Sequence, residues 1–276
     1  MKKRLGLSLS ACFLATSLTA GDQRLTAEDC SFIERYDRLN DYTFASDFAF
    51  MVHHAEHVEH NIYLEQPLQK RLLDIEISLV PGSNLEQVDA LNIGIRDFYL
   101  ITRSFTPINI TVRDFGDANL EYGGVLAVFL IDGRNIASFS NYFLSQGWDS
   151  TERYMKRIVR PGSTCGLTIW PFDKSSEVTD MFVNAEDFNT PKAIASCMRE
   201  EAFNSMGLRA DPQGDASIFS DPLWRGEPSE IEGDFGYGYR DELMLKMLYR
   251  PEFENGQSYA ETQEDVAGII RAECAG

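Results

Sequence analysis

Hydrophobic residues recur at helical spacing between Ala27 and Ile62. The apolar positions of this stretch are Phe32, Tyr36, Leu39, Phe44, Phe48 and either Met51 or Val52. Side chains three or four residues apart share one face of a helix, so this spacing is typical of amphipathic helices. It predicts an N-terminal helical extension over residues 21–66, which Pro67 closes.

Strand and helix patterns alternate after Pro67. The apolar residues Ile75, Ile77 and Leu79 alternate with polar ones, which predicts a half-buried strand over residues 73–80. Apolar residues at positions 88, 91, 95, 98 and 101 then predict a long helix over 85–103. Further strands are expected around 108–112, 125–131, 165–170 and 178–183, with a helix over 135–146. This order predicts an α+β fold with a helical layer on a mixed sheet and a right-handed crossover at its start.

The helix after the last predicted strand has clear boundaries. Thr190 is suited to be its N-cap and Pro191 its first residue, because the missing proline N–H would have no helical partner there. Gly207 is suited to end the helix, because glycine adopts left-handed conformations without strain. The segment 211–238 is rich in Gly, Pro, Asp and Ser and resembles a linker, and further helices are predicted over 241–249 and 260–272.

The first 20 residues have the composition of a secretory signal peptide. Three basic residues follow Met1, and an uncharged apolar run then ends in small residues before Gly21. Cleavage near Ala20 is expected, which would export the protein to the periplasm or the medium. The alternative is lipidation at Cys12, because the residues that precede it resemble a lipoprotein signal.

The predicted mature chain is strongly acidic. Removal of Lys2, Lys3 and Arg4 leaves 22 basic residues against 43 acidic ones, a net charge of about −21. Nucleic acids and anionic membranes would repel such a chain. No segment after the signal approaches the roughly 20 apolar residues of a membrane span. The expected partner is an unidentified protein or peptide.

Four cysteines remain after removal of the signal: Cys30, Cys165, Cys197 and Cys274. An even number in an oxidising compartment predicts two disulfides, for which three connectivities exist. We expect Cys165 to pair with Cys197, and Cys30 with Cys274, so that the second bond ties the two ends of the chain together. Free buried thiols are the alternative.

The helix predicted to begin at Pro191 has the layout of a zinc-protease helix without its histidines. In the zinc motif H-E-x-x-H, residues i and i+4 bind the metal and the glutamate polarises a bound water. Glu200, Glu201 and Asn204 occupy these three positions. Glu201 interrupts an apolar stripe, so it is either a structural carboxylate bonded to the following loop or the candidate catalytic base of an altered enzyme.

The spacing of the longer motif H-E-x-x-H-x-x-G-x-x-H extends this match past the helix. Gly207 falls on the glycine of the motif and Ala210 on its third histidine, with Asp211 next. Phe219 then stands where a methionine turn would have its methionine. The pattern predicts a metzincin-type frame, with a long helix and a degenerate active-site helix, whose metal ligands have been replaced.

A set of short motifs continues through the C-terminal half of the chain. They are Cys197-x-x-Glu200-Glu201, Gly207-Leu208, Ser217-Ile218-Phe219 and Asp241-Glu242-Leu243 to Leu248-Tyr249. In these motifs the chain resembles an uncharacterised family of exported bacterial proteins, domain of unknown function twenty-nine twenty-seven, in which Gln and Leu are usual where Asn204 and Met206 stand. The resemblance implies a zincin-like single domain over residues 67–276, and it implies no activity, because none is established for the family.

Two alternative metal sites follow from the sequence, although the chain is expected to carry no cofactor. Glu200, Asn204 and Asp211 would form an oxygen-only site that suits Ca²⁺, Mg²⁺ or Mn²⁺ better than zinc. The histidines His53, His57 and His60 would share one face of a helix and hold Zn²⁺ or Cu²⁺. The simpler interpretation of these histidines is an exposed polar helix face.

These patterns favour a binding or structural protein of the bacterial envelope over an enzyme. The first alternative is a metal-dependent hydrolase or peptidase with Glu201 as general base and unusual metal ligands. The second is metal binding through the histidine cluster at 53–60.

Overall fold

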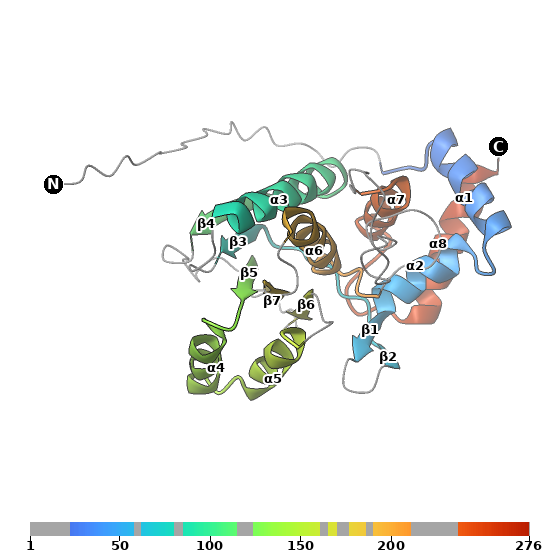
Figure 1. The fold of residues 1–276 in the computed structure, drawn as a ribbon. Coiled ribbons are helices and arrows are strands. Elements are labelled where there is room, and N and C mark those ends of the chain that lie inside the picture. The colour runs from blue at the N-terminus through green and yellow to red at the C-terminus, as the bar shows by residue number, and fades with distance from the viewer. Residues whose placement is uncertain are drawn as a thin grey trace.

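The computed structural model describes residues 23–57, 62–79, 85–114, 124–160, 165–169, 177–185, 190–210 and 237–275. Figure 1 shows a sheet with helices on both of its faces, and beside it a group of helices from the two ends of the chain. The architecture is therefore a mixture of α and β structure, as the sequence predicts. The predictions for the signal peptide and for Cys12 lie outside the described residues.

Two helices occupy the N-terminal segment for which one continuous helical pattern was predicted. They are α1 (Ala27–Leu39) and α2 (Phe44–His53), and each begins after a threonine N-cap. The chain turns between them because the Asp37 carboxylate accepts a hydrogen bond from the Phe44 N–H at 2.6 Å. In a continuous helix the Phe44 N–H would donate to a backbone carbonyl in the preceding turn, and here the Asp37 carboxylate takes the place of that carbonyl.

The prediction of helix between Ala27 and Ile62 is also wrong beyond His53. Strand β1 (His54–His57) follows α2 directly and pairs antiparallel with β2 (Ile62–Glu65). The His53 carbonyl accepts a hydrogen bond from the Gln66 N–H at 2.6 Å, which closes the open end of this hairpin. Of the histidines predicted to share one helical face, His53 is the last residue of α2 and His57 lies in β1, so these two do not share a helix.

The central sheet has five strands in the described residues, in the order β4-β3-β5-β7-β6. Neighbouring strands run parallel except β6, which pairs antiparallel with β7 at one edge. The bounds are β3 (Ile75–Leu79), β4 (Ile110–Asp114), β5 (Gly124–Ile131), β6 (Cys165–Ile169) and β7 (Glu177–Asn184). All five strand positions were predicted from the sequence, and the sheet is mixed as expected.

Helices cover both faces of this sheet. All eight residues of β5 are buried, and alternate side chains enter two different cores. Leu126 and Val128 join the core that includes helices α3 (Leu85–Phe105) and α6 (Pro191–Asn204). Phe129 joins the smaller core under α4 (Ile136–Ser145) and α5 (Asp149–Ile158). The sequence predicted α3, α4 and α6 but not α5.

The two ends of the chain form the second group of helices. Helices α7 (Tyr239–Leu248) and α8 (Tyr259–Cys274) pack beside α1 and α2, and these four helices share the larger core with the sheet. Both predicted disulfides are confirmed, since Cys30 is bonded to Cys274 and Cys165 to Cys197. Ion pairs inside the helical group join Lys246 to Asp29 and Arg240 to Asp47.

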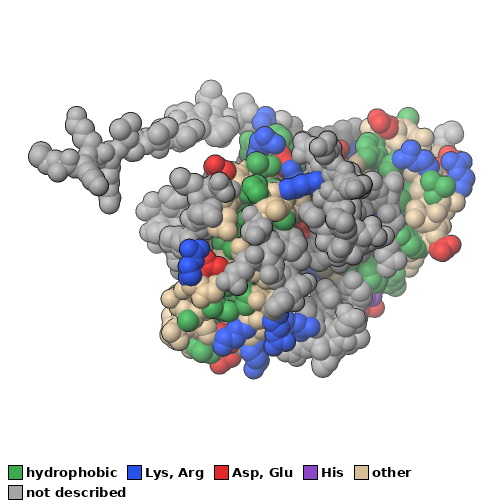
Figure 2. Space-filling view, in the orientation of Figure 1, with side chains coloured by type: hydrophobic (Ala, Val, Ile, Leu, Met, Phe, Trp, Pro, Cys, Tyr) green, Lys and Arg blue, Asp and Glu red, His purple; other side chains and the backbone are tan. Residues whose placement is uncertain are grey.

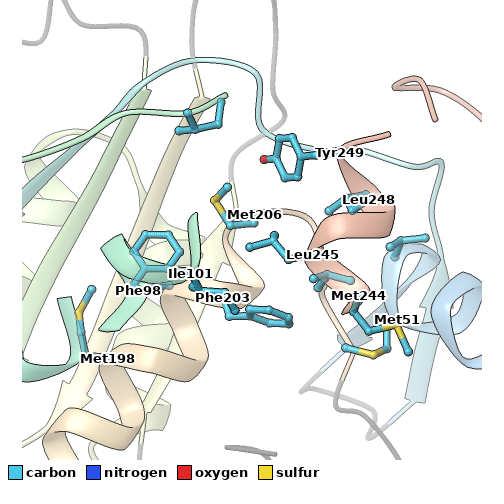
Figure 3. Packing of buried hydrophobic residues seen from close by; sticks show 14 of the residues in the cluster. Met51, Phe98, Ile101, Met198, Phe203, Met206, Met244, Leu245, Leu248 and Tyr249 are labelled. Carbon is cyan, nitrogen blue, oxygen red and sulfur yellow. The ribbon is translucent and has the colours of Figure 1, made fainter. Parts of the chain in front are cut away.

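The hydrophobic core is continuous between the sheet and the helical group. Figure 3 shows Phe98 of α3 beside Phe203 of α6, and the side chains of α7 following on from Met206. Leu245 and Leu248 of α7 are fully buried in this region. The segment that follows α6 reaches the helical group, since the N–H groups of Arg209 and Ala210 donate to the Met51 carbonyl of α2.

A close contact in this core joins α3 to α6 at Gly94. A Cβ atom placed on Gly94 would lie 2.6 Å from the Met198 Cβ and 2.8 Å from the Ala195 carbonyl oxygen. Only glycine lets the two helices approach this closely, because the carbonyl belongs to the backbone and has little freedom to move.

Gly94→Ala is predicted to destabilise the protein by about 1–3 kcal/mol through overpacking, despite the better helix propensity of alanine. Gly268→Ala in α8 is the matched control, because its added Cβ would meet nothing closer than 3.9 Å. The control should gain roughly 0.5–1 kcal/mol. Urea unfolding of both variants checks the pair, and a Gly94→Ala protein as stable as the control would contradict the close packing of α3 on α6.

Candidate functional site

Helix α6 carries the positions that the sequence compares with a zinc helix. It begins as predicted, with the Thr190 hydroxyl accepting a hydrogen bond from the Ala193 N–H and Pro191 in the first turn. The helix ends at Asn204, three residues before Gly207, which has a φ of +116° in the turn that follows. A Cβ at Gly207 would lie 2.5 Å from the Gln69 carbonyl oxygen, so both the backbone angle and the close contact require glycine.

A disulfide and an ion pair fix the position of α6 relative to its neighbouring elements. The Cys165–Cys197 disulfide bonds it to the edge strand β6. On its other side the Arg199 guanidinium donates to the Asp97 carboxylate of α3 at 2.6 and 2.8 Å. The Tyr237 hydroxyl adds a hydrogen bond to the Arg199 carbonyl at 2.7 Å. The helix is therefore attached to the sheet, to the long helix and to the start of the C-terminal helical segment.

The candidate ligand positions of α6 share one face and are buried. Cys197, Glu200, Glu201 and Asn204 are spaced at i, i+3, i+4 and i+7, which places them in one stripe along the helix. The exposed fractions of Glu200, Glu201 and Asn204 are 4%, 6% and 8%, and Ala210 is fully buried. The helix thus brings the three motif residues onto one side, but in the packed interior of the protein. Asp211 and Phe219 lie outside the described residues.

The surroundings of this stripe contain acidic side chains together with the Arg199 guanidinium. Burial raises the pKa of the Tyr237 hydroxyl well above its usual value, and the nearby carboxylates of Asp241 and Glu200 raise it further. Tyr237 is consequently neutral and serves as a hydrogen-bond donor. In the described part of the chain, the buried Asn204 Oδ1 accepts no hydrogen bond.

A buried arginine holds the end of α6. Arg71 is fully buried and donates to the Ser205 carbonyl at 3.4 Å, the Glu177 carbonyl at 2.9 Å and the Thr179 hydroxyl at 2.9 Å. The Glu177 carboxylate in turn accepts from the N–H groups of the two residues after Arg71, at 2.7 and 2.9 Å. Sequence analysis missed this arrangement, because Arg71 lies in a loop and no local pattern marks its distant partners.

The histidine cluster does not converge on a metal site in the described residues. His53 is fully buried, and its Nδ1 lies 2.7 Å from the Gln66 carbonyl while its Nε2 lies 2.8 Å from the Thr262 hydroxyl. A carbonyl only accepts, so Nδ1 carries the proton and Nε2 accepts from Thr262. Both ring nitrogens are therefore used within the protein. The side chains of His57 and His60 lie outside the described residues, and their role stays a prediction.

Among the described residues, no group of three or more His, Cys, Asp or Glu side chains is arranged to hold a metal ion. None of the described helices is long and apolar enough to cross a membrane. Comparison with known proteins found no matching family model, curated protein or solved structure. The resemblance to the uncharacterised exported family stays a prediction from the motifs.

The buried His53 is predicted to make stability depend on pH. Burial lowers the pKa of His53 below 6.5, so the unfolded chain binds a proton at a higher pH than the folded protein does. The free energy of unfolding should therefore fall as the pH decreases from about 7.5 towards the lowered pKa of His53. The decrease should be at most about 1.4 kcal/mol per pH unit.

Chemical denaturation between pH 7.5 and 5.5 checks this expectation. His53→Gln should remove this part of the pH dependence, even though the variant is less stable overall. His54→Gln is the matched control, since it removes the neighbouring histidine and leaves the hydrogen bonds of His53 in place. If the free energy of unfolding of His53→Gln fell with pH as steeply as that of the wild type, the buried histidine would not be the cause of the pH dependence.

Proposed function

We propose that this protein is an exported, non-catalytic binding or structural protein of the bacterial envelope, built on a zincin-like scaffold. The proposal joins the motif resemblance to the arrangement of α3, α6 and the mixed sheet. A long helix packed on a degenerate active-site helix is what the resemblance implies. The ligand would be a protein or peptide.

One observation carries this proposal: the positions that hold zinc ligands in the compared motif are packing positions in this chain. Glu200, Asn204 and Ala210 are each at most 8% exposed. A metal-activated water and a substrate both need access to the ligand face of such a helix. The residues of this face instead lie in the interior, between a disulfide on one side and the Arg71 arrangement on the other. Their placement supports a role in folding.

The same observation weakens the hydrolase alternative with Glu201 as general base. A general base must come within about 3 Å of the proton that it removes, directly or through one water. Glu201 is 6% exposed and belongs to a helix whose ends and sides are fixed. A carboxylate in that position favours an internal hydrogen-bonding role.

Export is supported by the cysteine chemistry. Both pairs of cysteines after residue 20 form disulfides, and one of them joins the first described helix to the last. Disulfides persist in the periplasm and outside the cell and are rare in the reducing cytosol. The two bonds are thus compatible with the predicted signal peptide.

Metal content and peptidase activity test the proposal together. The wild-type protein and Glu201→Gln are purified from the bacterial periplasm without added metal or chelator. Bound metals are measured by mass spectrometry, and hydrolysis is measured with fluorescent casein. We expect the wild type to contain far less than one zinc ion per chain and to hydrolyse casein at the background rate, with no change in Glu201→Gln.

Glu261→Gln is the matched control, because it makes the same chemical change at an exposed position of α8. The contrary result is a wild type with one bound metal ion per chain and measurable hydrolysis that Glu201→Gln loses and Glu261→Gln keeps. That result would assign catalysis to the degenerate helix.

A further inference from the structure

Helix α5 has two opposite faces of different chemistry. Thr151, Met155 and Ile158 are buried, and the last two belong to the small core beneath the sheet. The opposite face carries Arg153, Lys156, Arg157 and, just after the helix, Arg160. The apolar face attaches α5 to the sheet, so the basic face points outward.

We call these four basic residues the basic stripe. Arg153, Lys156 and Arg157 are spaced at i, i+3 and i+4, which places them on one side of α5, and Arg160 follows two residues after the helix. Arg153, Lys156 and Arg160 are exposed, and Arg157 is half-buried. Figure 2 shows Lys and Arg side chains gathered over α5 on this face of the molecule.

The basic stripe is exceptional in this chain. Four basic residues fall between positions 153 and 160, and no window of eight residues elsewhere after residue 20 that lies outside this stretch contains more than two. The whole chain carries 25 basic residues against 43 acidic ones. A concentrated positive surface on a strongly negative protein creates a local field that attracts an anionic group of limited size.

Acidic neighbours neutralise only part of the stripe. Glu152 forms an ion pair with Lys156 and also accepts a hydrogen bond from the Ser140 hydroxyl, and it is 5% exposed. Asp149 lies in the first turn of the helix, where it is stabilised by the positive end of the helix dipole. Arg153 follows Glu152 directly and stands four residues after Asp149, so part of its charge is offset, whereas the exposed Arg160 lies further along the chain.

We propose that the basic stripe of α5 is a docking surface for an acidic polypeptide segment of a partner protein. Arginine forks match carboxylates in geometry, and the exposed Arg153 and Arg160 fit Asp and Glu side chains that recur along a short segment. The proposal depends on α5 alone and holds whether or not the scaffold is zincin-like.

An acidic polypeptide fits the observations better than an anionic membrane. A bilayer would face the whole molecule, whose net charge of −18 it would repel. A peptide segment meets only the stripe, and solvent ions screen the remaining charges beyond roughly 8–10 Å. The size of the basic stripe therefore matches a short peptide segment and not a membrane surface.

Fluorescence anisotropy with a labelled glutamate-rich peptide tests the proposal, with a lysine-rich peptide of equal length as the probe control. The full chain should bind the acidic peptide only, and more weakly as salt rises. Arg153→Glu with Arg160→Glu should reduce affinity by about tenfold or more, because two attractive contacts become repulsive. Both positions are exposed, so circular dichroism should show an unchanged fold.

Arg35→Glu with Arg38→Glu on the exposed side of α1 is the matched control, because it changes the net charge equally. The proposal requires that this control bind like the wild type. It is overturned if the wild type does not bind the acidic peptide, or if both double variants weaken binding equally. Binding of phosphatidylglycerol vesicles through the stripe in place of the peptide would also overturn it.

Discussion

The hydrogen bonds of the buried Arg71 guanidinium and its backbone connect the sheet and α6 to the helical group formed by the two ends of the chain. Burial of a charge is unfavourable, and it lowers the pKa of Arg71 to about 10, so the side chain must be hydrogen-bonded from several directions. Its partners come from the end of α6 and from β7, while its own carbonyl accepts from the Tyr249 hydroxyl at 2.9 Å. One residue thus sets the positions of the sheet, of α6 and of the end of α7.

Covalent and polar contacts at several points fix the position of α6. Helix α6 is joined to β6 by a disulfide, to α3 by the Asp97 ion pair and to the loop before β3 by Arg71. A helix held at so many points keeps its place without a metal ion. Glu200, Asn204 and Ala210 are buried, and glycine is required at position 207 by its backbone angle and by the nearby Gln69 carbonyl.

Features set by local chemistry were predictable from the sequence. The cap at Thr190, the long α3 helix and the apolar strand β5 follow from spacing and residue type, and the structure contains them. The two disulfides were expected as one of three possible connectivities, and the structure contains that pairing. No helix was predicted at the position of α5, although Thr151, Met155 and Ile158 have helical spacing. The hairpin after His53 and the partners of Arg71 depend on residues far away in the chain, so no local pattern could reveal them.

Hydrogen exchange at the amides of Glu200 to Asn204 tests most directly whether α6 is a packed structural helix. These amides should exchange only when the whole protein unfolds, with the same free energy that denaturant unfolding gives, and addition of a metal chelator should change nothing. Exchange through a local opening far below the global free energy, or a loss of protection after chelation, would show that the helix lines an accessible metal-dependent cleft.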